Sequence, residues 1–131
     1  MRVAIKRPGH FTEIVESCLG QTFKLPIEGV ATDNRECLPG DLYIAIKGER
    51  TDGHSFLSSV KKSGAAAALV EFPDSTIDLQ QIKVEDPQSM IGEIAHDWRK
   101  QFDIPIIGIT GSNGKTSTKE LLFHVLSNKY D

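Results

Sequence analysis

The amino-acid sequence predicts an α/β protein, in which short apolar strands alternate with amphipathic helices along 131 residues. Three observations support this prediction. Apolar runs too short for typical helices occur at residues 42–46 and 65–70. Apolar side chains recur at helical spacing in residues 11–19 and again after Pro87. Towards the end of the sequence, a glycine-rich loop lies between a further apolar run and a further helical pattern.

The first 86 residues are expected to hold two helices and three strands. The first helix covers residues 11–19, whose apolar side chains share one face, and Gly20 is its expected stop because glycine commonly ends a helix. Asp52 is the expected cap of a second helix from about residue 54 to 63, and Gly64 is its stop. The strands are expected at residues 42–46, 65–70 and 82–84.

The second part of the chain begins with the clearest helical signal. Asp86 offers an N-cap carboxylate and Pro87 suits the first helical position, so a helix is predicted from there to about residue 102. An apolar strand at 104–110, a loop at 111–115 and a helix from 116 to about 128 are predicted to follow. This order divides the chain into a small α/β domain at residues 1–86, a connector helix at 87–103 and a last unit at 104–131.

Composition and charge disfavour several classes of protein. The net charge of −3 argues against a nucleic-acid-binding protein, which would usually carry a basic face. No apolar run approaches the length that crosses a bilayer and no signal peptide is evident, so we expect a cytoplasmic protein without a membrane partner. Cys18 and Cys37 are expected to be free thiols. His10, His96 and His124 are scattered and lack a second ligand at metal spacing.

The loop at residues 111–116 carries the most specific chemistry. Gly111 and Gly114 allow a tight turn whose backbone N–H groups point at a polyphosphate, and the dipole of the following helix adds to the attraction. Lys115 is expected to reach the β- and γ-phosphates of ATP, and the Thr116 hydroxyl to be a ligand of Mg²⁺. These two residues are the expected catalytic groups. The expected ATP-binding set is Gly111, Ser112, Asn113, Gly114, Lys115, Thr116 and Ser117.

The glycine spacing departs from the commonest phosphate-binding motif, which would place a glycine at Ile109. The shorter form in residues 110–120 resembles the ATP-binding loop of the Mur ligases, the enzymes that build the peptidoglycan stem peptide. Upstream, residues 32–35, 38–50, 52–56 and 64–66 resemble the N-terminal domain of that family in the same order and spacing. Asn34 is a departure, because Ser or Thr is more usual there.

The resemblance implies both a fold and a reaction. The implied fold is a small N-terminal mixed-sheet substrate domain followed by the first strand–P-loop–helix of a truncated central ATPase domain. In the implied reaction, ATP phosphorylates the terminal carboxylate of a UDP-N-acetylmuramoyl-peptide, and the amine of D-alanyl-D-alanine attacks the acyl phosphate to form an amide. The implied UDP-substrate ligands are Thr32, Asp33, Asn34, Arg35, Lys47, Gly48, Asp52, Gly53 and His54.

Several of these residues also have a purely structural interpretation. Asp33 and Arg35 could pair across a turn as a surface ion pair of little energetic weight. Asp52 could be only the helix cap, a role that is compatible with a ligand contact. His54, at the start of the same helix, could contact an anion or make a structural hydrogen bond. The sequence leaves these alternatives open.

Within the family, the motifs most resemble the members that add D-alanyl-D-alanine, and the members that add diaminopimelate or lysine are the alternative. A stand-alone UDP-sugar or nucleotide-binding module is a second alternative. Because the remaining family domains are not in this sequence, the chain alone is expected to be inactive. The apolar residues at 104–109 are expected to dock on the first domain or to pair with another copy of the chain.

Overall fold

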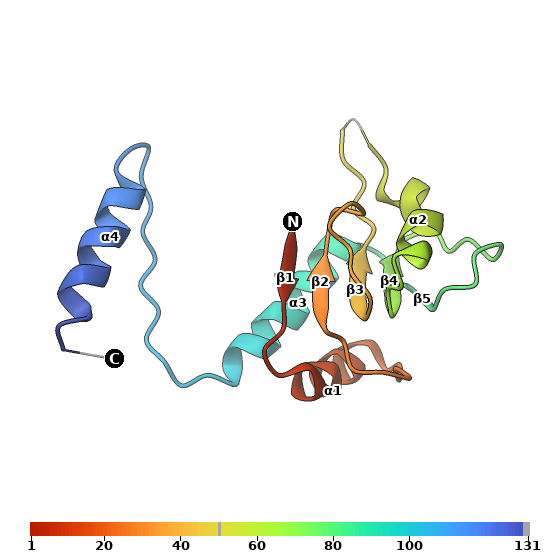
Figure 1. Cartoon of the computed structure of the whole chain (residues 1–131), viewed down its shortest axis with the longest axis horizontal. Helices are drawn as coiled ribbons and strands as arrows, with labels where there is room; N and C mark the ends of the chain where they lie inside the picture. Colours follow the sequence, from red (N-terminus) through yellow and green to blue (C-terminus); the bar gives the residue numbers. More distant parts are fainter. Residues whose placement is uncertain (50, 130–131) are drawn as a thin grey trace.

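A computed structural model describes residues 1–49 and 51–129 and contains a five-stranded sheet with helices on both of its faces (Figure 1). The strands lie side by side in sequence order. β1 is antiparallel to β2, and the other neighbouring pairs are parallel. The strands are β1 (Arg2–Ala4), β2 (Gly29–Ala31), β3 (Asp41–Ile44), β4 (Ala67–Val70) and β5 (Gln81–Lys83). This mixed sheet with its helices confirms the predicted α/β class.

The structure confirms the predicted helices, although one of them consists of two shorter helices. Gly20 ends the first helix with a left-handed φ of 61°. Asp52 and Asp86 are caps as predicted, since each carboxylate accepts a hydrogen bond from a backbone N–H two residues later. The second predicted helix is divided into a short 3-10 turn and an α-helix. The helices are α1 (Pro8–Leu19), η1 (Gly53–Phe56), α2 (Leu57–Lys62), α3 (Pro87–Lys100) and α4 (Lys115–Leu126).

Successive side chains of the central strands point to opposite faces of the sheet, so the core has two layers. On one face of the sheet, side chains of β3 and β4 pack with Phe11 and Val15 of α1 and with Ile94 of α3. On the other face, the intervening side chains pack with Leu57 and Val60 of α2. Because both faces are covered, β3 and β4 are buried at every position, as expected of central parallel strands.

A partly buried ion pair joins three strands at the amino ends of β2 and β3. The Asp41 side chain is fully buried and accepts hydrogen bonds from Nε and Nη2 of Arg2 at 2.7 and 2.9 Å. Leu38 donates its backbone N–H to the same carboxylate at 2.9 Å. Gly29 of β2 lies between β1 and β3, and a Cβ built there would meet Asp41 Oδ1 at 2.4 Å. Glycine is therefore required at this position for the ion pair to pass over β2.

Strands β1 and β2 were not predicted from the sequence. Each has only three residues, and β1 carries the charged Arg2 and is largely exposed along one edge of the sheet. Three residues are too few to show the alternation from which a strand is recognised. Their pairing with each other and with β3 defines them instead.

The strand predicted at residues 104–110 is absent, and the segment is irregular. Ile104, Ile106 and Ile107 are 56, 64 and 61% exposed. A strand needs a hydrogen-bonded neighbour, and none of the described strands pairs with this segment. The expectation that it docks on the first unit is therefore wrong, whereas its pairing with another copy of the chain stays a prediction.

The Arg99 side chain, near the end of α3, bonds to the backbone at the start of this segment. Nη2 of Arg99 donates to the Ile104 carbonyl at 2.7 Å, and Nη1 donates to the Phe102 carbonyl. The Trp98 ring meets the rings of Phe11 and Phe102 edge-on, each at a centroid distance of 5.2 Å. The chain then extends to α4, which stands apart from the sheet and buries none of its residues (Figure 1).

Both cysteines are free thiols, as predicted. Burial raises the pKa of Cys37 to about 11, so this thiol is protonated at neutral pH. Cys18 is less buried, and its Sγ lies 3.6 Å from Asp97 Oδ2. Across residues 1–49 and 51–129, none of the helices has the length and apolar character that a bilayer crossing requires.

We predict that Gly29→Ala lowers the free energy of unfolding by about 1–3 kcal/mol, because the new methyl group displaces the buried Asp41 carboxylate from Arg2. Gly92→Ala is the matched control. Gly92 lies in α3 with nothing within 4 Å of a built Cβ, so alanine there should raise stability by up to about 1 kcal/mol. Urea denaturation of the two variants checks this, and equal stabilities would contradict it.

Candidate functional site

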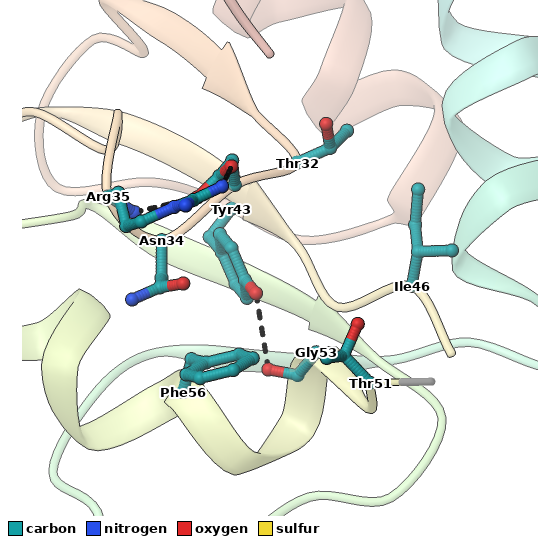
Figure 2. A pocket seen from close by; sticks show the side chains of 9 residues that line it. Thr32, Asn34, Arg35, Tyr43, Ile46, Thr51, Gly53 and Phe56 are labelled. Atoms are coloured by element: carbon teal, nitrogen blue, oxygen red, sulfur yellow. Dashed lines mark hydrogen bonds and ion pairs between the residues drawn. The ribbon is translucent and has the colours of Figure 1, made fainter. Parts of the chain in front are cut away.

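A cavity of about 390 Å³ opens beyond the carboxyl ends of the neighbouring parallel strands β2 and β3. Its walls come from the loop that follows β2 and from the turn that follows β3, together with η1 (Figure 2). Ligands of open α/β sheets commonly bind at this edge. The lining residues are Thr32, Asp33, Asn34, Arg35, Tyr43, Ile46, Thr51, Gly53 and Phe56.

The loop after β2 presents a fixed guanidinium at the cavity. Arg35 donates from Nε to Asp33 Oδ1 at 2.9 Å and from Nη2 to Asp33 Oδ2 at 2.6 Å. The Arg35 backbone N–H donates to the same carboxylate at 3.0 Å. These bonds from Arg35 lower the pKa of Asp33 well below its usual range. The Arg35 side chain nevertheless stays 82% exposed, so it is oriented by Asp33 and open to an anion.

The same loop offers polar groups without partners. Within the described residues, the backbone N–H groups of Asp33 and Asn34 and the Asn34 amide make no hydrogen bond. Figure 2 shows the Asn34 side chain reaching into the cavity between Arg35 and Phe56. The loop can therefore supply both backbone donors and a side-chain amide to one ligand.

Tyr43 forms the floor of the cavity. Its ring is buried, and its hydroxyl donates to the Gly53 carbonyl at 3.2 Å (Figure 2). Burial raises the pKa of Tyr43 to about 12. Gly53 packs so closely that a Cβ built on it would lie 2.8 Å from the backbone nitrogen of Ile46. The turn after β3 is thus held by backbone contacts that exclude a side chain at Gly53.

Residues 47–48 and 51–52 are bonded to each other beside the cavity. Lys47 and Asp52 form an isolated antiparallel bridge, and the Gly48 N–H donates to the Thr51 carbonyl at 2.9 Å. Lys47 lines an adjoining hollow of about 220 Å³ near the start of α3, which also has Ile46 in its wall. The Asp52 pKa is lowered by the hydrogen bonds that its carboxylate accepts from the backbone and side chain of His54.

The structure divides the nine expected UDP-substrate residues into two groups. Those that line the cavity are Thr32, Asp33, Asn34, Arg35 and Gly53. Those that lie behind or beside it are Lys47, Gly48, Asp52 and His54. His54 is bound to Asp52 and to the backbone after β4 rather than directed into the cavity.

Four lining residues were missed: Tyr43, Ile46, Thr51 and Phe56. The sequence carried a partial signal for them, because Thr51 lies within the expected ligand loop and Phe56 follows it closely. Tyr43 belongs to β3, in which every residue is buried. Its hydroxyl can bond to the Gly53 carbonyl only because the turn after β3 folds back over the strand. Sequence periodicity cannot distinguish such a floor residue from other core residues.

The glycine loop forms the turn that its sequence predicts. Gly111 and Gly114 adopt φ values of 150° and 76°, which disfavour residues with side chains. Gly114 is the N-cap residue of α4, and Lys115 Nζ donates to the Gly111 carbonyl. Every residue from Gly111 to Ser117 is exposed.

This turn brings together the N-terminus of α4 and the Lys115 amine, which is bonded to the Gly111 carbonyl. A helix N-terminus is a general anion-binding feature of proteins. The Thr116 hydroxyl is an exposed oxygen that fits a role as one Mg²⁺ ligand. In the part of the chain that the structure describes, no group of three His, Cys, Asp or Glu side chains could hold a metal ion.

Comparison with known proteins gives consistent matches. Residues 26–99 match the Mur ligase family, catalytic domain. A UDP-N-acetylmuramoyl-tripeptide–D-alanyl-D-alanine ligase from a Synechocystis species is 43% identical over 86% of this chain and 26% of its own length. A UDP-N-acetylmuramoyl-L-alanyl-D-glutamate–2,6-diaminopimelate ligase from Chlorobium phaeobacteroides is 36% identical over 87% of this chain and 23% of its own length.

Solved structures resemble the chain over most of its length. MurF from Acinetobacter baumannii matches with a TM-score of 0.80 and 32% identity, covering 90% of this chain and 27% of that one. MurF ligase from Thermotoga maritima, solved in complex with ADP, matches with a TM-score of 0.69 and 34% identity, covering 76% of this chain and 23% of that one. The chain thus spans about a quarter of the length of the relatives that it matches.

We predict that Tyr43→Phe costs about 0.5–1.5 kcal/mol of stability through loss of the hydrogen bond to Gly53. The raised pKa of Tyr43 also stabilises the wild-type fold, fully below the unfolded value near pH 10 and progressively less as pH rises towards 12. The variant should lack this alkaline loss of stability. Urea denaturation between pH 8 and 12 (roughly the span of both pKa values) checks the prediction. Identical pH dependence in the two proteins would contradict it.

Proposed function

Because the chain belongs to the Mur ligase family, we propose that it provides the nucleotide-sugar-binding part of an ATP-dependent ligase of peptidoglycan precursors. The substrate is a UDP-N-acetylmuramoyl-tripeptide, and the group added is D-alanyl-D-alanine. The cavity at the carboxyl ends of β2 and β3 carries this proposal, since it gathers an exposed guanidinium, free backbone donors and an amide. The 43% identity to a D-alanyl-D-alanine-adding relative supports the choice of substrate.

In this proposal, the charged part of the UDP group binds at the loop after β2. Arg35 and the backbone N–H groups of Asp33 and Asn34 are donors suited to a diphosphate. The Asn34 amide can bond the edge of uracil, which offers one N–H and two carbonyls. Thr32 and Thr51 add hydroxyls to the wall.

The second group of expected residues supports the cavity from behind. Lys47 is exposed beside it and adds positive charge. Gly48 and Asp52 belong to the bonded residues beside the cavity, His54 anchors them, and Gly53 provides the carbonyl that holds Tyr43. We therefore assign direct ligand contacts to the residues on the cavity wall and a supporting role to these.

The glycine loop is the proposed binding site for the phosphates of ATP. Lys115 would leave the Gly111 carbonyl and neutralise charge on the β- and γ-phosphates, and Thr116 would hold Mg²⁺. The Thermotoga maritima relative was solved in complex with ADP, which supports an adenine nucleotide as the ligand. Ser112, Asn113 and Ser117 complete the turn around the phosphates.

The proposed reaction forms one amide bond for each ATP consumed. A carboxylate oxygen of the UDP-linked tripeptide bonds to the γ-phosphorus, and ADP leaves. The amine of D-alanyl-D-alanine then attacks the acyl carbon, and inorganic phosphate leaves as the amide forms. Lys115 supplies electrostatic stabilisation during phosphoryl transfer rather than a covalent intermediate.

The proposed organisation follows from the two sites. Residues 1–86 form the UDP-substrate domain, α3 and its flanking residues the connector at 87–103, and residues 104–131 the start of the ATP-binding domain. We propose a cytoplasmic location, with no membrane or nucleic-acid partner. Pairing of residues 104–109 with a second copy is proposed for the isolated chain, because these residues are apolar and exposed.

A diaminopimelate-adding ligase is the second candidate, because one such relative is 36% identical over 87% of the chain. The two candidates differ in the amine that they accept. Supplying the complete protein with D-alanyl-D-alanine or with diaminopimelate, each with its matching UDP-peptide, distinguishes them. Amide formation with diaminopimelate alone would overturn the first choice.

We predict that the 131-residue chain binds UDP and UDP-N-acetylmuramoyl-tripeptide, and that Arg35→Ala weakens both affinities about tenfold through loss of the guanidinium. Lys61→Ala is the control, because Lys61 pairs with Asp78 and does not line the cavity. Isothermal titration calorimetry measures all three proteins. Absence of binding by the wild type to both compounds would refute the assignment of the cavity.

In the complete protein, Lys115→Ala is predicted to reduce ATP-dependent amide formation by about 10²-fold or more, because phosphoryl transfer loses its fixed positive charge. Affinity for UDP should stay the same, since Lys115 does not line the cavity and belongs to α4, which stands apart from the sheet (Figure 1). Phosphate release and product formation are the readouts. Full activity of the Lys115→Ala variant would contradict the role of the loop. The 131-residue chain alone should form no amide, and amide formation by it would contradict its expected inactivity.

A further inference from the structure

We propose that His54 is a positioning residue for the cavity, a neutral imidazole that carries its proton on Nδ1 and ties residues 51–53 to the backbone after β4. The inference rests on the proposed function, because these residues matter only if the cavity binds a nucleotide sugar. It differs from a ligand role, since His54 acts through Asp52 and touches no substrate.

One ring nitrogen of His54 must be an acceptor. The backbone N–H of Glu71 points at Nε2 from 3.0 Å, and the N–H of Phe72 points at the same atom from 3.4 Å. A backbone amide can only donate, so Nε2 presents its lone pair and bears no hydrogen. An imidazolium would place a hydrogen on Nε2 against these two donors. The ring is therefore neutral in this arrangement.

The other ring nitrogen must then be a donor. In a neutral imidazole without a hydrogen on Nε2, the proton lies on Nδ1. Nδ1 lies 2.6 Å from Oδ1 of Asp52, which accepts that proton. The same oxygen accepts the backbone N–H of His54 at 3.0 Å. These two bonds fix the Asp52 carboxylate relative to the ring.

The ring thus joins two loops that are distant in sequence. Asp52 ends the loop that bridges back to Lys47, and the next residue, Gly53, holds the Tyr43 hydroxyl at the cavity floor. Glu71 and Phe72 directly follow β4, whose residues are all buried, so this anchor belongs to the rigid part of the sheet.

The ring is also packed into place. Only 13% of the His54 side chain is exposed, and the Phe72 ring packs beside it at a centroid distance of 5.9 Å. His54 does not line the cavity, and both ring nitrogens are engaged within the chain. A ligand could bond to the ring only by displacing Asp52 or the Glu71 backbone.

Two substitutions test the Asp52 bond and the Glu71 bond of the His54 ring separately. His54→Asn keeps a side-chain N–H near Asp52 but is too short to reach Glu71, whereas His54→Gln can reach Glu71 with its carbonyl but lacks the donor at the Nδ1 position. Both variants should weaken UDP binding about tenfold by freeing residues 51–53. His96→Gln is the control, because His96 is exposed on α3 and should leave the affinity unchanged.

The experiment uses the 131-residue chain with UDP as the probe. Calorimetry measures affinity, and nitrogen-15 NMR of the histidine rings reports which nitrogen bears the proton. We expect His54 of the wild type to be Nδ1-protonated both with and without UDP. This readout needs no variant, so it holds even where a substitution prevents folding.

Separate outcomes overturn separate claims. A proton on Nε2, or a change in the Nε2 signal on UDP binding, would overturn the positioning role and indicate direct contact. Folded variants that bind UDP as tightly as the wild type would overturn it too. If the wild type binds neither UDP nor UDP-N-acetylmuramoyl-tripeptide, the proposed function fails, and the positioning role fails with it.

Discussion

The ion pair between Arg2 and Asp41 is the constraint on which the rest of the sheet depends. A fully buried carboxylate is stable only where charge and hydrogen bonds compensate it, and Asp41 obtains both from Arg2 and from the Leu38 backbone. The contact crosses Gly29, so it holds β1, β2 and β3 in one register at the amino ends of β2 and β3. The opposite ends of β2 and β3 are then free to diverge into loops, and the cavity lies between those loops. The stabilising ion pair and the ligand cavity therefore lie at opposite ends of the same two strands, β2 and β3.

Much of the fold could be predicted from local signals. The runs in β3 and β4, the cap at Asp86 with Pro87 behind it, and the glycine stop of α1 each depend on nearby residues only. β1 and β2 could not be predicted, because three-residue strands are defined by their partners rather than by their own pattern. Residues 104–110 show the converse: their composition is that of a buried strand, yet a strand forms only where another strand pairs with it.

The site divides in the same manner. The loop at residues 32–35 was predicted as a unit, because its members are consecutive and resemble a family motif. Tyr43 and Phe56 were missed, because their part in the cavity depends on how the turn after β3 folds back over the sheet. The position of His54 was expected but its partners were not. Glu71 lies 17 residues further along the chain, and only the parallel pairing of β3 with β4 brings the two together.

The hydrogen bonds of Arg99 determine where the backbone after α3 ceases to be held by the sheet and its helices. Arg99 fixes the carbonyls of Phe102 and Ile104, so the first residues after the helix move as one body with the sheet. In the described part of the chain, the backbone of residues 105–110 makes no hydrogen bond to that body. The first backbone position that these bonds leave unheld is therefore Pro105, whose ring restricts its own φ. Residues 105–110 form a short extended segment between this body and the glycine loop. The length of the segment limits the distance between the two, but it does not fix their relative orientation.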